Sequence, residues 1–186
     1  MMPFYLQKVL LYSPKEVGLI LIPAAVCMVV LGPISGRLSD RFGWHILTVG
    51  GLLLGAAAWL VLAVSLSPDS SLGLIIAMLM LQSSGTGLFN TPNSSSILSA
   101  VDRSSYGVVS ALTQLTRNSA NVTSIAVATT VVVTTMGAKG VDPSLDAVSP
   151  DVADAFLAGL RLAFWLMSSI LVVGVVICII RGERAG

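Results

Sequence analysis

The feature that most constrains this chain is a series of five apolar runs, each long enough to cross a lipid bilayer. A helix needs about 20 mostly apolar residues to span the hydrocarbon. Lipid offers no partner to unpaired backbone groups, so such runs fold as helices. The sequence therefore predicts an all-α, polytopic membrane helical bundle with spans at residues 17–36, 46–66, 72–90, 106–137 and 156–180. A shorter apolar stretch, residues 1–11, predicts the end of a further helix, an N-terminal helix stub.

The composition excludes several classes of protein. Of the 186 residues, 55% are hydrophobic and only 10% are charged, against about 25% charged in soluble domains. A net charge of +1 with no basic run leaves no electrostatic surface for nucleic acid. The runs contain no Ser–His pair, paired carboxylates or metal-ligand pattern, so we expect neither an enzyme nor a metal or cofactor site. The expected surroundings are a lipid bilayer.

Local signals predict how the helices begin and pack. Ser13 and Glu16 have the spacing of a capping box, and Pro14 suits the first helical position. Gly51 and Gly55 are spaced as a small-residue packing face. The third span is expected to end near residue 90, before Pro92 and a Ser-rich segment. Arg161 lies near one end of the fifth span, where its long side chain can extend to the lipid headgroups.

The loop charges predict an orientation. Basic residues gather on the cytoplasmic side of membrane helices. If the connection 36–45 is cytoplasmic, five basic residues fall inside and three outside. The inside set is Arg37, Arg41, Arg103, Arg181 and Arg184, and the outside set is Lys8, Lys15 and Lys139. We therefore expect a multi-pass protein of the cell membrane with a cytoplasmic C-terminus.

One arginine lies within a predicted membrane span, where a charged side chain is costly. Arg117 is inside the run 106–137, which is otherwise free of charge. A charge near the bilayer centre costs about 2.5–3.5 kcal/mol, so it faces a water-filled cavity or a partner. Spacings of three and four place polar residues on its side of the helix. We expect this polar stripe to line a substrate cavity through Ser110, Gln114, Arg117 and Asn121, with Ser124 extending it.

The alternative for Arg117 is a structural clamp, in which the guanidinium bonds to carbonyl groups of a neighbouring helix. Intramembrane polar groups require such partners. In the third span, Gln82, Ser83 and Ser84 are the candidates to supply them. Both readings stay open at the level of sequence.

The connection 36–45 has the most specific local pattern in the chain. Gly36 permits close helix approach, Asp40 and Arg41 place opposite charges at the membrane surface, and Gly43 supplies a turn. The pattern resembles the signature of the major facilitator superfamily, Gly-x-x-x-Asp-Arg/Lys-x-Gly-x-Arg/Lys, with His45 at the last position. The resemblance implies that Asp40 and Arg41 belong to a loop that latches the cytoplasmic side of a transporter.

Further stretches narrow the resemblance to the fourteen-helix drug:proton antiporter branch. Residues 85–93 are similar to its Gly-rich, Pro-terminated helix. Gly107, Ser110, Ala111, Gln114 and Arg117 fit its Gly-x-x-Ser-Gly/Ala-x-x-Asn/Gln-x-x-Arg helix. The resemblance implies the C-terminal part of such a transporter, from the end of the ninth helix to the fourteenth, and half of a major facilitator fold.

The resemblance also implies a function. The full-length protein would transport small organic or drug-like molecules by alternating access, as proton-coupled efflux. Its partners would be the small-molecule substrate and the N-terminal half of the transporter. No Asp or Glu lies inside the five spans, so a proton carrier would belong to that other half. The alternative is a truncated, non-transporting membrane module that scaffolds or modulates a partner.

Overall fold

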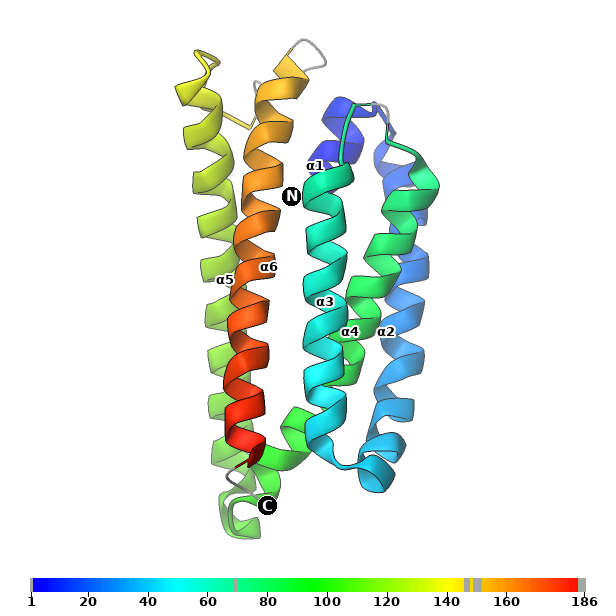
Figure 1. The fold of residues 1–186 in the computed structure, drawn as a ribbon, viewed down its shortest axis with the longest axis vertical. Helices are drawn as coiled ribbons and strands as arrows, with labels where there is room; N and C mark the ends of the chain where they lie inside the picture. Colours follow the sequence, from blue (N-terminus) through cyan, green and yellow to red (C-terminus); the bar gives the residue numbers. More distant parts are fainter. Residues whose placement is uncertain (1, 69, 146–147, 149–151, 184–186) are drawn as a thin grey trace.

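The computed structural model describes residues 2–68, 70–145, 148 and 152–183, and these form a bundle of long helices (Figure 1). A short N-terminal segment consists of α1 (Met2–Phe4) and a π-helical turn, η1 (Tyr5–Val9). Five long helices follow, with a 3₁₀ turn, η2 (Arg103–Ser105), between the third and fourth. They are α2 (Pro14–Phe42), α3 (Trp44–Ser65), α4 (Leu72–Ser99), α5 (Tyr106–Ala138) and α6 (Ala153–Glu183).

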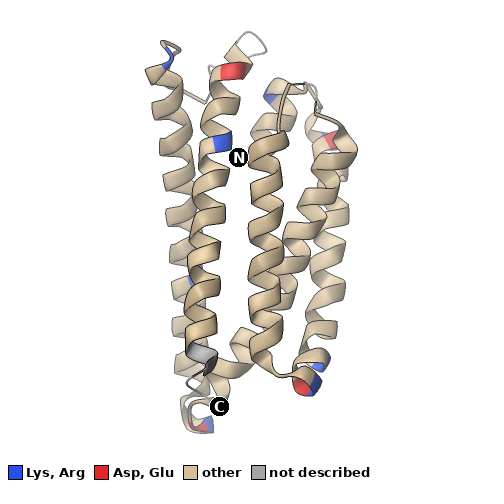
Figure 2. Cartoon of the chain, in the orientation of Figure 1, with Lys and Arg blue, Asp and Glu red and all other residues tan. Residues whose placement is uncertain are grey.

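The all-α prediction is confirmed. The described residues contain no strand, and five helices are long and apolar enough to cross a membrane. Figure 2 shows the charged residues gathered mainly near the two ends of the bundle, where a bilayer would meet water. The apolar segment ahead of Ser13 is helical, as expected, and its Tyr5 and Leu6 are fully buried.

The start of α2 follows the predicted capping box. The Glu16 backbone N–H donates to Ser13 Oγ at 3.4 Å, and the Ser13 N–H donates to Glu16 Oε2 at 2.8 Å. The end of α2 differs from the prediction, because the helix continues past Gly36 to Phe42. Only Gly43, with φ of 87°, separates it from α3. Apolar length marks where lipid ends, and a helix can continue into water beyond that point.

Helix α4 also runs further than predicted, through Pro92 to Ser99. Proline has no N–H, so it leaves the carbonyl four residues earlier without its helical donor. That carbonyl belongs to Leu88, and Ser35 Oγ of α2 donates to it at 3.0 Å. Ser35 is fully buried. A hydroxyl from a neighbouring helix thus replaces the missing bond and allows the helix to continue.

Small residues bring α3 and α4 into backbone contact. A Cβ atom added to Gly51 would lie 2.5 Å from the Gly85 carbonyl oxygen, and one added to Gly85 would lie 2.5 Å from the Gly51 oxygen. At Gly55 the same atom would meet Leu171 of α6 at 3.3 Å. The predicted packing face at Gly51 and Gly55 is confirmed. Helices α5 and α6 meet in the same way, since a Cβ on Gly159 would lie 2.8 Å from Val132 Cα.

Three side chains form hydrogen bonds between α3 and α6, from one end of the pair to the other. His45 Nε2 donates to the Cys178 carbonyl at 2.7 Å, and Ser168 Oγ donates to the Ala56 carbonyl at 3.0 Å. Arg161 donates to the Leu66 carbonyl through Nε at 2.8 Å and also through Nη2. The last carbonyls of a helix lack intrahelical donors, and they favour a cation. Arg161 therefore binds the end of α3, rather than extending to the headgroups.

Candidate functional site

The predicted polar stripe lies on the outside of α5. Ser110, Gln114 and Asn121 are exposed, and Arg117 is half-exposed. Gln114 donates from Nε2 to Asn118 Oδ1 at 3.1 Å, within its own helix. In this chain the polar stripe therefore presents polar side chains on the surface of a membrane helix.

Arg117 reaches across to α4. Its Nη2 donates to Ser94 Oγ at 2.8 Å. The partner is not one of those predicted: Gln82 bonds to Thr86, and Ser84 donates to the Met80 carbonyl, both within α4. Ser94 was missed because the sequence predicted that the third span ends before Pro92. Reading Pro92 as an intrahelical proline would have placed Ser94 two residues further along the same helix.

A separate cavity of about 940 Å³ lies between α3, α4, α5 and α6. The wall from α3 and α4 includes Gly51, Gly55, Trp59, Gln82 and Thr86. The α5 wall runs from Leu115 to Val131, and α6 adds residues such as Ala163 and Met167. The sequence did not predict this cavity, because it forms only where two pairs of helices stand apart.

The cavity and the polar stripe occupy neighbouring faces of α5, which meet at Ser124. Ser124 lies at the cavity wall, whereas Ser110, Gln114, Arg117 and Asn121 are not among the lining residues. The hydroxyl-bearing residues that α5 does turn to the cavity are Thr116, Ser119, Thr123 and Ser124. A role of the polar stripe in lining a substrate path therefore concerns the outer surface of α5 and remains a prediction.

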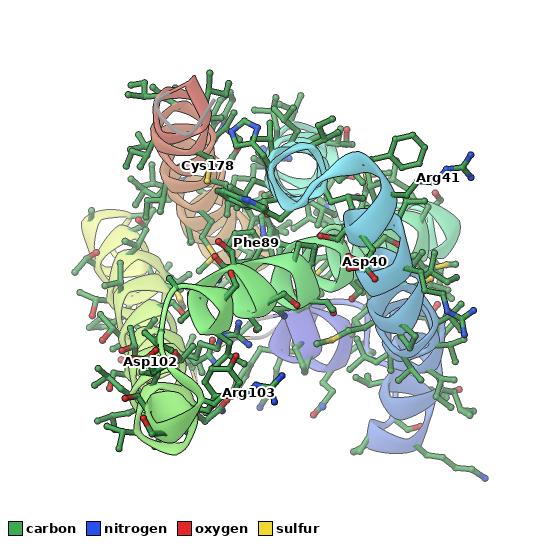
Figure 3. All side chains as sticks on the ribbon, turned by 90° about the horizontal axis from the view of Figure 1, so that it is seen from below. Asp40, Arg41, Phe89, Asp102, Arg103 and Cys178 are labelled. Atoms are coloured by element: carbon green, nitrogen blue, oxygen red, sulfur yellow. The ribbon has the colours of Figure 1, made fainter. Side chains whose placement is uncertain are left out.

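The segment Gly36–Gly43 forms about the last two turns of α2 and the turn to α3. A Cβ on Gly36 would lie 3.3 Å from Thr91 Cγ2, so this glycine allows α2 to approach α4 closely. Asp40 and Arg41 lie at the end of the bundle that also carries Asp102 and Arg103, and Arg41 points away from the other helices (Figure 3). The Arg41 guanidinium lies over the Phe42 ring, 5.6 Å from its centroid. The latch role of Asp40 and Arg41 remains a prediction.

Several curated transporters resemble the chain. The riboflavin transporter RibZ of Clostridioides difficile is 36% identical over 108 residues, which are 58% of this chain and 23% of that protein. The uncharacterized transporter YebQ of Escherichia coli is 32% identical over 111 residues, or 60% of this chain and 24% of that protein. The multidrug resistance protein Stp of Mycobacterium tuberculosis is 27% identical over 147 residues, which are 79% of this chain and 27% of that protein.

The chain spans about a quarter of the length of these relatives. No solved structure matches it significantly. The sequence profile of the Major Facilitator Superfamily matches residues 1–141, which is most of the chain and includes both the segment Gly36–Gly43 and the polar stripe. The chain therefore belongs to the Major Facilitator Superfamily.

Proposed function

We propose that the full-length protein transports small organic molecules across the cell membrane by alternating access, and that α5 lines the substrate path. The observation that carries this proposal is the exposure of the polar stripe. Ser110, Gln114 and Asn121 are exposed on a helix that crosses the membrane. Polar groups are costly in hydrocarbon. Their exposed face therefore belongs against water, substrate or the other half of the transporter.

The relatives support this proposal and indicate a substrate class. One is named for riboflavin, a small organic molecule, and a more distant one for multidrug resistance. We extend the proposal to drug-like substrates and to proton-coupled efflux. The proton carrier would lie outside this chain, because the acidic residues of its helices lie at their ends. The scaffold alternative has no observation in its favour.

The proposed orientation places the turn at Gly43 in the cytoplasm. The connection between α4 and α5 and the end of α6 lie at the same end of the bundle as this turn (Figure 1). Arg37, Arg41 and Arg103 belong to this end, which is the arrangement that the positive-inside rule favours. Asp40 and Arg41 then stand where the two halves of a transporter would close against each other on the cytoplasmic side.

Two variants in a full-length transporter containing this chain test the proposal. Arg117→Gln removes the charge and weakens the bond to Ser94. Ser94→Ala removes the same bond and keeps the charge. We expect Arg117→Gln to change substrate preference per folded molecule, while Ser94→Ala leaves it unchanged. Equal losses of folded protein in the two variants, with transport per molecule intact in both, would show that Arg117 is only a clamp.

A further inference from the structure

We infer that the outer face of α5 around Arg117 binds an anionic oxygen group, such as a carboxylate, of a small organic molecule. This inference rests on the proposed function and names the chemical class of its substrate. Three features of the helix point to it: the charge of Arg117, the way in which its guanidinium is held, and the hydrogen-bond donors beside it.

The Arg117 charge has no counter-charge in the described part of the bundle. Arg117 belongs to a helix that can cross the membrane, and neither α5 nor the neighbouring α4 contains an Asp or Glu. Its bond to α4 is made to a neutral hydroxyl, that of Ser94. A charge on a membrane helix is costly and is kept where it meets water or a partner. An anion that reaches this half-exposed side chain therefore finds a positive charge that no carboxylate of these two helices compensates.

Ser94 orients the guanidinium and leaves most of its donors available. The Ser94 hydroxyl donates its own hydrogen to the Asn90 carbonyl at 2.8 Å, so its oxygen accepts the bond from Arg117 Nη2. A guanidinium carries five N–H donors in a planar fork. Among the described residues, Ser94 is the acceptor bonded to this fork. The remaining N–H groups match the two oxygens of a carboxylate, which a guanidinium binds in a bidentate pair.

The side chains beside Arg117 add further donors. Gln114 Nε2 donates to Asn118 Oδ1 at 3.1 Å, which occupies the acceptor of the Asn118 amide and leaves its N–H groups. The Asn121 side chain, about one turn beyond Arg117, is exposed and has no hydrogen-bond partner in the described part of the chain. A charged donor with amides beside it favours a ligand with acceptor oxygens, and the guanidinium repels a cation.

A clamp between α5 and α4 does not by itself require a charge. The amide of a Gln side chain also donates to a hydroxyl oxygen such as that of Ser94, and it carries no net charge into the membrane. The bond to Ser94 therefore accounts for the direction of the Arg117 side chain. An anionic ligand accounts for its charge.

The test compares two probes of nearly equal size and different charge, naphthoate and naphthamide. Equilibrium dialysis measures the binding of each probe to a full-length transporter containing this chain, in detergent. Size-exclusion chromatography gives the amount of folded protein, so that binding is counted per folded molecule. Transport is measured separately, in vesicles, with a panel of small organic molecules.

We expect the parent protein to bind naphthoate at least about tenfold more tightly than naphthamide, because hydrogen bonds to charged groups are the stronger ones. Arg117→Gln should remove this preference. Arg117→Lys keeps the charge without the fork and should retain part of it. Ser94→Ala should keep the preference, since the charge remains. Arg103→Gln, which removes an exposed charge at the end of the bundle, is the matched control and should also keep it.

Failure of the folded parent protein to bind naphthoate more tightly than naphthamide would overturn the inference. A preference that survives in Arg117→Gln, or that Arg103→Gln removes, would overturn it as well. Transport of the panel without a preference for the carboxylate probe would contradict this inference and leave the proposed function intact. Selective binding of naphthoate without transport would support the site and contradict the proposed function.

Discussion

Helices α3 and α5 are both long and apolar enough to cross a membrane, yet they differ in how much of their surface packs against the rest of the chain. In the most apolar stretch of α3, 44% of the residues are buried in the protein, against 17% in the corresponding stretch of α5. Glycines bring α3 against α4, and hydrogen bonds from three side chains join α3 to α6. Helix α5 carries the polar stripe, and among the described residues its side-chain bond to α4 is the one between Arg117 and Ser94. The more polar helix is thus the more exposed one.

This contrast shows what holds each helix in the bundle. In lipid, apolar residues do not need protein neighbours, so burial follows backbone packing and polar bonding instead. Helix α3 is fixed because its contacts lie within this chain. Helix α5 instead exposes polar side chains on its outer face, among them Ser110, Gln114 and Asn121. We therefore expect substitutions in α3 to affect stability, and substitutions in α5 to affect function in the full-length protein.

The largest expected effect is that of Gly51→Val. The added Cβ would lie 2.5 Å from the Gly85 carbonyl oxygen, so the α3 and α4 backbones must separate. We expect a loss of about 3 kcal/mol, the upper part of the range for overpacking, seen as a lower thermal unfolding temperature in detergent. Gly50→Val is the matched control, since nothing lies within 4 Å of its Cβ. Equal losses in the two variants would show that the α3–α4 contact does not set stability.

Arg161→Met should have the next largest effect. It removes both donors from the Leu66 carbonyl at the end of α3 while keeping an apolar side chain of similar length. Hydrogen bonds to charged groups contribute about 1.5–3 kcal/mol, and we expect a loss of that size in unfolding free energy. Arg161→Lys keeps one charged donor and should lose less. If Arg161→Met matches the parent protein, the end of α3 does not depend on α6.

Ser168→Ala should cost about 0.6 kcal/mol, the average for an intramembrane hydrogen bond. The Ser168 hydroxyl is buried and donates to the Ala56 carbonyl on α3. The neighbouring Ser169 donates to the Trp165 carbonyl within α6, so Ser169→Ala is the control and should cost less. Chemical unfolding of the two variants side by side measures the contribution of the link between the helices. A larger loss from Ser169→Ala would contradict the role given to Ser168.

The smallest stability effect is expected for Asn121→Ala on α5. Its side chain is exposed, so we expect the unfolding free energy to change by less than about 0.5 kcal/mol. In a full-length transporter the same substitution should nevertheless shift substrate preference, because the side chain belongs to the polar stripe. A clear loss of stability with unchanged transport would remove the functional contrast between α3 and α5.

The five helices could be predicted from sequence because apolar length alone decides whether a segment crosses lipid. Their ends could not, since α2 and α4 continue past the apolar runs, through Gly36 and Pro92. The capping box and the glycine face were also readable, because each depends on residues within one helix. The roles of Ser35 and Ser94 could not be predicted, because they depend on which helices become neighbours.

The candidate site was predictable only in part, for the same reason. The spacing of Ser110, Gln114, Arg117 and Asn121 places them on one side of α5, and three of them are exposed together. Nothing in that spacing shows which neighbour the side faces. The second polar face, with Thr116 and Thr123, lies at a cavity whose position depends on the separation of two helix pairs.

The bond between Ser35 and the Leu88 carbonyl has a consequence for how this protein can change by mutation. Ser35→Ala alone would leave the Leu88 carbonyl without this donor, and Pro92 has already removed the helical one. If Pro92 is replaced first, the helix supplies its own bond and the hydroxyl becomes dispensable. Variation at these positions, 57 residues apart in the chain, is therefore ordered in time: the proline must be lost before the serine.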